Sequence, residues 1–111
     1  MKWLLNSAVI PAAAYGTYRF TRASVDELRA FCTEAPAPVS RIGYRETVLL
    51  IEQLTGYRPA EDRSPAALAP GDRAMIVRLK YRVDPNAKGQ TTHAQHDDWE
   101  VALLERLEDP R

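Results

Sequence analysis

The chain has 111 residues, enough for one domain with a single hydrophobic core, and we predict one domain over residues 1–111. An apolar fraction of 45% and a charged fraction of 27% are typical of ordinary globular proteins. The 15 Lys and Arg residues balance the 15 Asp and Glu residues, which argues against a protein that coats long nucleic acid. A small anionic ligand stays possible if the positive charges gather on one face.

Cysteine content and hydropathy exclude further classes. Cys32 is the only cysteine, so an intrachain disulfide and a cysteine metal cluster are excluded. No stretch approaches the roughly 20 apolar residues of a membrane span. We therefore expect a protein that does not act at a membrane.

The N-terminal residues allow two interpretations. Residues 1–14 combine a lysine, an apolar run and several alanines, as a secretory signal does. Asn6, Ser7 and Pro11 interrupt that run, and a strand over residues 3–10 that turns at Pro11 fits equally well. Composition leaves both open.

A second strand is predicted over residues 15–21, and a helix follows it. Ser24 and Glu27 have the spacing of a capping box, which starts a helix by satisfying its first free N–H groups. The apolar residues of this helix fall on one stripe: Val25, Leu28, Phe31 and Cys32. Pro36 and Pro38 end it.

The next segments give a helix, an irregular stretch and a strand. The helix is predicted over residues 45–55, ends at Gly56, and is apolar on most sides, which indicates heavy burial. Three prolines and a glycine make residues 57–72 mostly irregular. Residues 73–83 alternate as a strand, residues 84–98 form a polar loop or flap, and residues 99–107 fit either a strand or a short helix.

Three features carry possible chemistry. The first is the row Arg78, Lys80 and Arg82 on one face of the predicted strand 73–83. Residues two apart on a strand lie about 7 Å apart, near the spacing of successive phosphates, and arginine binds phosphate bidentately. A solvated sheet face explains the row equally simply, and for the row alone it is the commoner outcome.

The second feature is the junction from Ser40 to Thr47, where extended chain enters a helix across Gly43. The first N–H groups of a helix lack internal partners, which makes such a junction a natural phosphate seat, and glycine permits close approach. The alternative is that Gly43 only makes a turn.

The third is the polar loop around His93 and His96, whose histidines and carboxylates suggest a metal site. Histidines three apart in a polar loop are more often solvated, so no metal site is predicted. The chain has no Walker-type glycine loop, no paired-cysteine motif and no serine triad.

Several motifs in order along the chain resemble a known family. They are Leu4-Leu5-Asn6-Ser7-Ala8, Ser40-Arg41-Ile42-Gly43-Tyr44 with the helix ending Leu54-Thr55-Gly56, Leu79-Lys80-Tyr81-Arg82, and Leu103-Leu104-Glu105-Arg106-Leu107. The chain is similar to the small viral anti-CRISPR ring nucleases that act against type III systems. The resemblance covers nearly the whole chain and favours the strand over the secretory signal.

That resemblance implies an α/β (α+β) fold, with a mixed sheet of about five strands flanked by helices, in a homodimer. It also implies a cyclic tetra-adenylate pocket that spans the dimer axis, in the host cytoplasm if the protein is viral, and ring cleavage without a metal or cofactor. A two-fold protein suits a ring that itself contains a two-fold axis.

The resemblance also assigns site residues. Arg82 matches the catalytic arginine, and Tyr44 stands where active members have a histidine that acts as general acid. The acidic residue expected after the arginine falls at or near Pro85, beside Asp84. The implied ligand-binding residues are Asn6, Ser7, Ser40, Ile42, Gly43, Arg45, Thr47, Arg78 and Lys80.

The tyrosine leaves the activity open. Histidine, with a pKa of about 6.5, is a good proton donor near neutrality, whereas tyrosine, at about 10, is a much poorer one. His93 or His96, in the predicted flap, offers a replacement donor. Three outcomes follow: a slow ring nuclease, a sponge or sensor that binds without cleaving, and an interaction module that kept the fold and lost the ligand. Zero net charge disfavours a general RNA-binding protein.

Overall fold

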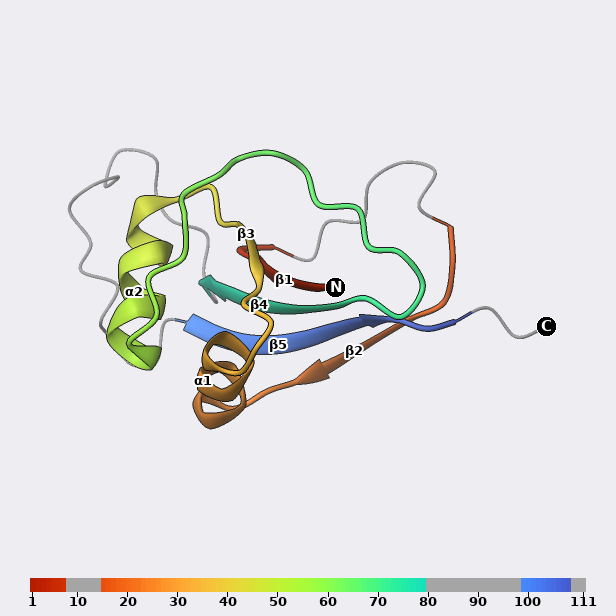
Figure 1. Cartoon of the computed structure of the whole chain (residues 1–111), viewed down its shortest axis with the longest axis horizontal. Helices are drawn as coiled ribbons and strands as arrows, with labels where there is room; N and C mark the ends of the chain where they lie inside the picture. Colours follow the sequence, from red (N-terminus) through yellow and green to blue (C-terminus); the bar gives the residue numbers. More distant parts are fainter. Residues whose placement is uncertain (8–14, 80–98, 109–111) are drawn as a thin grey trace.

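The computed structural model describes residues 1–7, 15–79 and 99–108. The described chain forms a five-stranded mixed sheet and two helices (Figure 1). The elements in chain order are β1 (Lys2–Leu5), β2 (Tyr18–Arg22), α1 (Val25–Thr33), β3 (Val39–Arg41), α2 (Arg45–Thr55), β4 (Arg73–Leu79) and β5 (Trp99–Arg106). The α/β fold with a mixed sheet of five strands is confirmed.

The strand order is β2-β5-β4-β1-β3, with β1 parallel to both β3 and β4 and β5 antiparallel to β4 and β2. Because β1, β3 and β4 are parallel, their carboxyl ends meet at one edge of the sheet, which we call the carboxyl edge. In open α/β sheets ligands bind outside the carboxyl ends of the strands. The topology therefore points to this edge as the place for a site.

Both helices begin and end as the sequence predicts. The side chain of Ser24 accepts a hydrogen bond from the N–H of Glu27, whose side chain bonds back to the N–H of Ser24. Gly56 ends α2 in the left-handed region, at φ 79°, where glycine carries no steric penalty.

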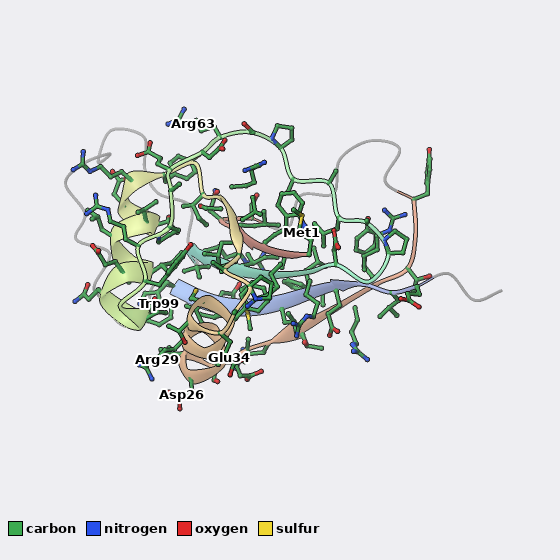
Figure 2. The ribbon with its side chains drawn as sticks, in the orientation of Figure 1. Met1, Asp26, Arg29, Glu34, Arg63 and Trp99 are labelled. Carbon is green, nitrogen blue, oxygen red and sulfur yellow. The ribbon has the colours of Figure 1, made fainter. Side chains whose placement is uncertain are left out.

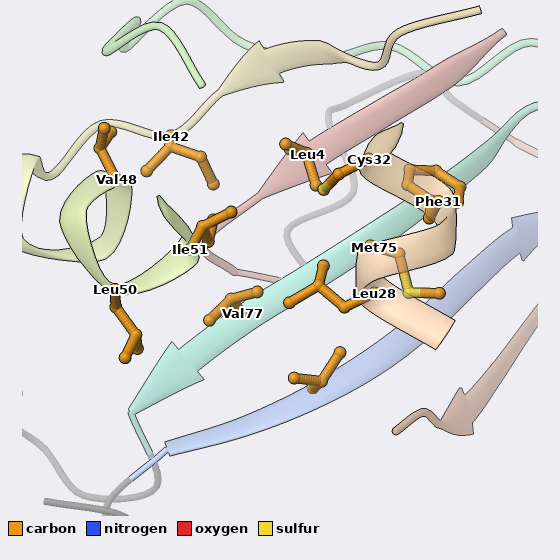
Figure 3. Close-up of a cluster of buried hydrophobic side chains, with 11 residues drawn as sticks. Leu4, Leu28, Phe31, Cys32, Ile42, Val48, Leu50, Ile51, Met75 and Val77 are labelled. Carbon is orange, nitrogen blue, oxygen red and sulfur yellow. The ribbon is translucent and has the colours of Figure 1, made fainter. Parts of the chain in front are cut away.

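One face of the sheet is covered by both helices. The cluster on this face joins side chains of α1 and α2 to those of β1, β4 and β5 (Figure 3). Its buried members are Leu4, Leu28, Phe31, Cys32, Ile42, Val48, Leu50, Ile51, Met75, Val77 and Val101. Burial raises the pKa of the Cys32 thiol to about 11, as expected for a core cysteine. Burial of α2 is less complete than predicted, because Leu49 is 42% exposed.

The opposite face is covered by the later part of the segment 57–72, which runs without helix or strand from α2 to β4 (Figure 1). Leu68 from this segment packs on side chains of β1, β4 and β5, which are Trp3, Leu5, Ala74, Ile76 and Leu104. Ile76 is fully buried, so the face that it shares with Arg78 is not an open solvated surface along its whole length.

Several strands differ from the sequence prediction or settle what it left open. The first strand ends at Leu5 instead of residue 10, because the chain bends at residues 6 and 7 and the side chain of Asn6 bonds to Gly43. The second strand begins at Tyr18, three residues later than predicted. Residues 99–106 are a strand, and β3 is a short strand that pattern reading did not separate from the following helix.

Part of the prediction falls beyond the described residues. This holds for residues 8–10 of the first predicted strand, for residues 80–83 of the fourth and for the flap at 84–98. Among the described helices, none has the length and apolar character needed to cross a membrane.

Candidate functional site

A pocket of about 280 Å³ opens at the carboxyl edge, between the ends of β1 and β3 and the segment 63–66. The ends of these two parallel strands supply one wall, and the irregular segment supplies the other. Its described lining residues are Leu5, Asn6, Ser7, Arg41, Gly43, Tyr44, Arg63, Ser64, Pro65 and Ala66. Arginines stand among them and no carboxylate does, so the described lining is cationic.

Gly43 joins the walls of the pocket. Its N–H donates to Oδ1 of Asn6 (3.1 Å), and its carbonyl accepts from Nε of Arg63 (2.9 Å). A Cβ at this position would lie 3.0 Å from Cγ of Arg63. Glycine therefore permits the close approach of Arg63, because a Cβ here would make the Arg63 side chain shift. The sequence predicts the approach of another backbone or a ligand, and in the structure the approaching group is a side chain.

Tyr44 occupies the N-cap position of α2 without making a side-chain capping bond, and its side chain is 48% exposed. The guanidinium of Arg63 lies 5.7 Å from the centre of the Tyr44 ring, within the range of a cation–π contact. Arg63 projects outward from the irregular segment (Figure 2). The pair offers an aromatic face and a positive charge side by side, which suits a nucleotide.

A second arginine lies deeper in the same pocket. Arg41 ends β3, and its side chain is 25% exposed and forms an ion pair with Asp62 (Nη1–Oδ2 3.2 Å). Hydrogen bonds from Ser64 hold the pKa of Asp62 below its usual range, and the charge of Arg41 adds to the effect. Asp62 is therefore ionised at neutral pH and offsets part of the charge of Arg41.

Of the predicted ligand-binding residues, Asn6, Ser7 and Gly43 line the pocket, as does the predicted catalytic Tyr44. Ser40 and Ile42 are buried and do not line it. The hydroxyl of Ser40 donates to the carbonyl of Ala60 and accepts from the N–H of Ile42. Through its bond to Ala60, Ser40 holds the irregular segment beside β3.

Arg45 and Thr47 belong to the first turn of α2 and do not line the pocket. Arg78, the first residue of the predicted basic row, bonds through Nε to Oε1 of Glu100 (2.6 Å) and lies 5.4 Å from the centre of the Phe20 ring. Its charge is thus paired within the sheet. Lys80, Arg82, His93 and His96 lie outside the described residues, so their roles stay predictions.

Sequence reasoning missed Arg41, Arg63 and Ser64 as pocket residues. The parallel bridge between Ile42 and Glu61 brings the segment 60–66 alongside β3. A segment rich in proline carries no periodic pattern, so nothing in it signals which strand it follows. The described residues contain no group of three His, Cys, Asp or Glu side chains able to hold a metal ion.

Comparison with known proteins gives a family and a fold. A family model described as STIV B116-like matches residues 2–100. The solved structure of B116 from Sulfolobus turreted icosahedral virus is similar, with a TM-score of 0.72 over 95% of this chain and 98% of B116. Sequence identity is 14%, so this likeness shows the fold alone. No curated protein matches the sequence.

Proposed function

This chain belongs to the STIV B116-like family, and we propose that it binds cyclic tetra-adenylate at the carboxyl-edge pocket and slowly cleaves the ring. Cleavage uses the ring's own 2′-hydroxyl and no metal, and it antagonises type III CRISPR signalling. The observation that carries the proposal is the pocket of two arginines, Tyr44 and no acidic side chain among the described lining residues.

Each described group has a counterpart in an adenylate. Arginine pairs with phosphate oxygens through parallel charge-assisted hydrogen bonds. An adenine stacks on the half-exposed Tyr44 ring, and the Nδ2 of Asn6 and the hydroxyls of Ser7 and Ser64 donate to sugar or base atoms. The sequence resemblance points to the same two segments, the end of β1 and the start of α2.

The size of the pocket supports a homodimer. Sites that enclose one drug-sized ligand have roughly 300–1,000 Å³, so a pocket of about 280 Å³ takes about one nucleotide. A four-nucleotide ring needs more than one such pocket. Two copies related by a two-fold axis present the same contacts twice to a ring with matching symmetry.

In the proposed reaction both the attacking group and the leaving group belong to the ring. The 2′-oxygen attacks the adjacent phosphorus and loses its proton to solvent, while the bond from phosphorus to the 5′-oxygen breaks. The departing 5′-oxygen takes a proton from Tyr44, and the Tyr44 phenolate then regains a proton from solvent. The product carries a 2′,3′-cyclic phosphate at one end and a 5′-hydroxyl at the other. Tyrosine is a weak acid near neutrality, so the step is slow.

Incubation of the protein with radiolabelled cyclic tetra-adenylate in EDTA, followed by product separation, tests the proposal. We expect linear products that end in a 2′,3′-cyclic phosphate. If the ring stays intact but its mobility shifts, the protein binds the ring without cleaving it. If the ring is neither bound nor cleaved, the protein is an interaction module that kept the fold and lost the ligand. Light scattering that gives a monomer mass with ligand present contradicts the shared pocket.

A further inference from the structure

The guanidinium of Arg41 has one end occupied by protein groups. Its Nη1 donates to the carbonyl of Ser40 (3.0 Å) and to Oδ2 of Asp62 (3.2 Å). Nη1 is a single NH2 group, so these bonds use both of its hydrogens. Any further bond from Arg41 must come from Nε or Nη2.

That second edge has no partner among the described residues. Nε is buried without a hydrogen-bond partner, and no bond from Nη2 to a described residue is present. The Nε–H and one Nη2–H of arginine are parallel and match the two oxygens of a phosphate or carboxylate. A buried charged donor without an acceptor is costly, so an oxyanion on this edge offsets a cost already present in the fold.

The edge is held in a fixed direction. The guanidinium lies 5.3 Å from the centre of the Trp3 ring, which supports it from one side. Trp3 is itself buried and donates through Nε1 to Oδ2 of Asp72 (3.2 Å). With the Asp62 pair and the Trp3 ring both in place, Arg41 has little freedom to turn away, so little entropy is lost when it binds a ligand.

We infer that Arg41 is an oxyanion-binding residue, which takes one phosphoryl group of the pocket's ligand on its Nε–Nη2 edge. The inference rests on the proposed function for the identity of the ligand, and on Arg41 alone for the chemistry. It separates the roles of the two arginines. Arg63 lies on the exposed Tyr44 ring, whereas Arg41 binds at the deeper end.

The direct test follows the Nε–H of Arg41 in 1H–15N spectra of the whole protein, titrated separately with inorganic phosphate and with cyclic tetra-adenylate. We expect the Arg41 signal to move with both probes. The Nε–H of Arg58, which pairs with Glu52 away from the pocket, is the internal control and stays in place.

Affinity gives a second, independent readout. Arg41→Lys keeps the charge but loses the two-pronged edge, so we expect cyclic tetra-adenylate to bind at least about tenfold more weakly. Arg58→Lys makes the same change at an exposed ion pair outside the pocket and should bind as the parent does. If Arg41→Lys does not fold, the spectra of the parent protein still decide.

The outcomes separate this inference from the proposed function. If the parent binds cyclic tetra-adenylate while the Arg41 signal and the Arg41→Lys affinity stay unchanged, the inference is overturned and the proposed function stands. If phosphate moves the Arg41 signal but cyclic tetra-adenylate does not bind, the oxyanion subsite stands and its assigned ligand is wrong. If neither probe moves the signal, Arg41 is a structural ion pair.

Discussion

The two faces of the sheet are covered in different ways. On one face, α1 and α2 bury a continuous cluster against β1, β4 and β5. On the other face, the segment 57–72 has no regular structure and covers a smaller cluster around Leu68. The helix-covered side has the larger core, and the segment-covered side borders the cationic pocket.

The difference follows from where backbone groups find partners. A helix satisfies its own interior N–H and C=O groups, so it packs through apolar side chains alone. An irregular segment must find partners elsewhere. Ser40 bonds to Ala60, the N–H of Asp62 to Ile42, and Arg63 to Gly43. Those bonds bring polar side chains together at one edge, and a cationic pocket results.

The largest expected effect lies at the pocket. Tyr44→His should raise the single-turnover rate of ring cleavage, by up to about 10²–10⁴-fold, while changing affinity little. The physical reason is that a better-matched proton donor acts in the transition state and hardly at all in the ground state. Single-turnover assays with labelled cyclic tetra-adenylate in EDTA measure the rate.

Tyr44→Phe is the matched control, because it keeps the ring against Arg63 and removes only the hydroxyl. It should abolish residual cleavage and leave binding intact. An inert Tyr44→His together with a fully active Tyr44→Phe would place Tyr44 outside the chemistry and show that the catalytic position implied by the resemblance is wrong.

On the helix-covered face the effect should be on stability alone. Ile51 is fully buried in α2, and Ile51→Ala should lower the free energy of unfolding by about 2–5 kcal/mol because it leaves a cavity. Leu49→Ala, on the same helix at a position 42% exposed, should cost less than about 1 kcal/mol. Urea unfolding measures both. If folded Ile51→Ala shows a large change in ligand affinity, the helix-covered face contributes to binding as well as to stability, contrary to this prediction.

Asp72 offers a smaller effect on the segment-covered face. Burial favours its neutral form, but bonds from the Met1 amine, the N–H of Ala69 and the Trp3 indole outweigh burial and lower its pKa. Asp72→Asn should cost about 1.5–3 kcal/mol at pH 7, the usual range for hydrogen bonds to a charged group. Asp26→Asn, at an exposed pair with Arg29, is the control and should cost little.

The pH dependence of unfolding tests whether the ionised form of Asp72 stabilises the fold. A carboxyl whose pKa is lowered on folding adds stability above its unfolded pKa of about 3.9, and that stability is lost as pH falls through the folded value. The difference between the parent and Asp72→Asn should therefore shrink between pH 5 and pH 2. A difference that stays constant over that range would show that the charge of Asp72 is not what holds the segment.

Most of the regular fold was within reach of the sequence. The capping box at Ser24, the stop at Gly56 and the alternation of β4 depend on residues a few positions apart. The first two are confirmed, and the alternation is confirmed from Ala74 to Val77. The sequence did not predict the short strand β3, and it did not decide between strand and helix for β5. A three-residue strand has too few residues to show a pattern, and the spacing of apolar residues in β5 fits both structures, so pairing with the neighbouring strands decides.

The sequence predicted only part of the candidate site. Asn6, Ser7, Gly43 and Tyr44 were predicted and do line the pocket. The basic row suggested Arg78 as a ligand contact, but the antiparallel register places Glu100 opposite it and pairs the charge. Arg41 and Arg63 carry no local signal of their own, because their roles depend on contacts with Trp3 and Tyr44.

Local chemistry was enough to place helix starts, helix stops and the apolar stripe of α1, because these depend on hydrogen bonds and spacing within a few residues. The path of residues 60–66 along β3, and with it the second wall of the pocket, was decided by the tertiary structure. The physical reason is that an irregular segment takes its course from distant partners, here the carbonyls of Ile42 and Gly43.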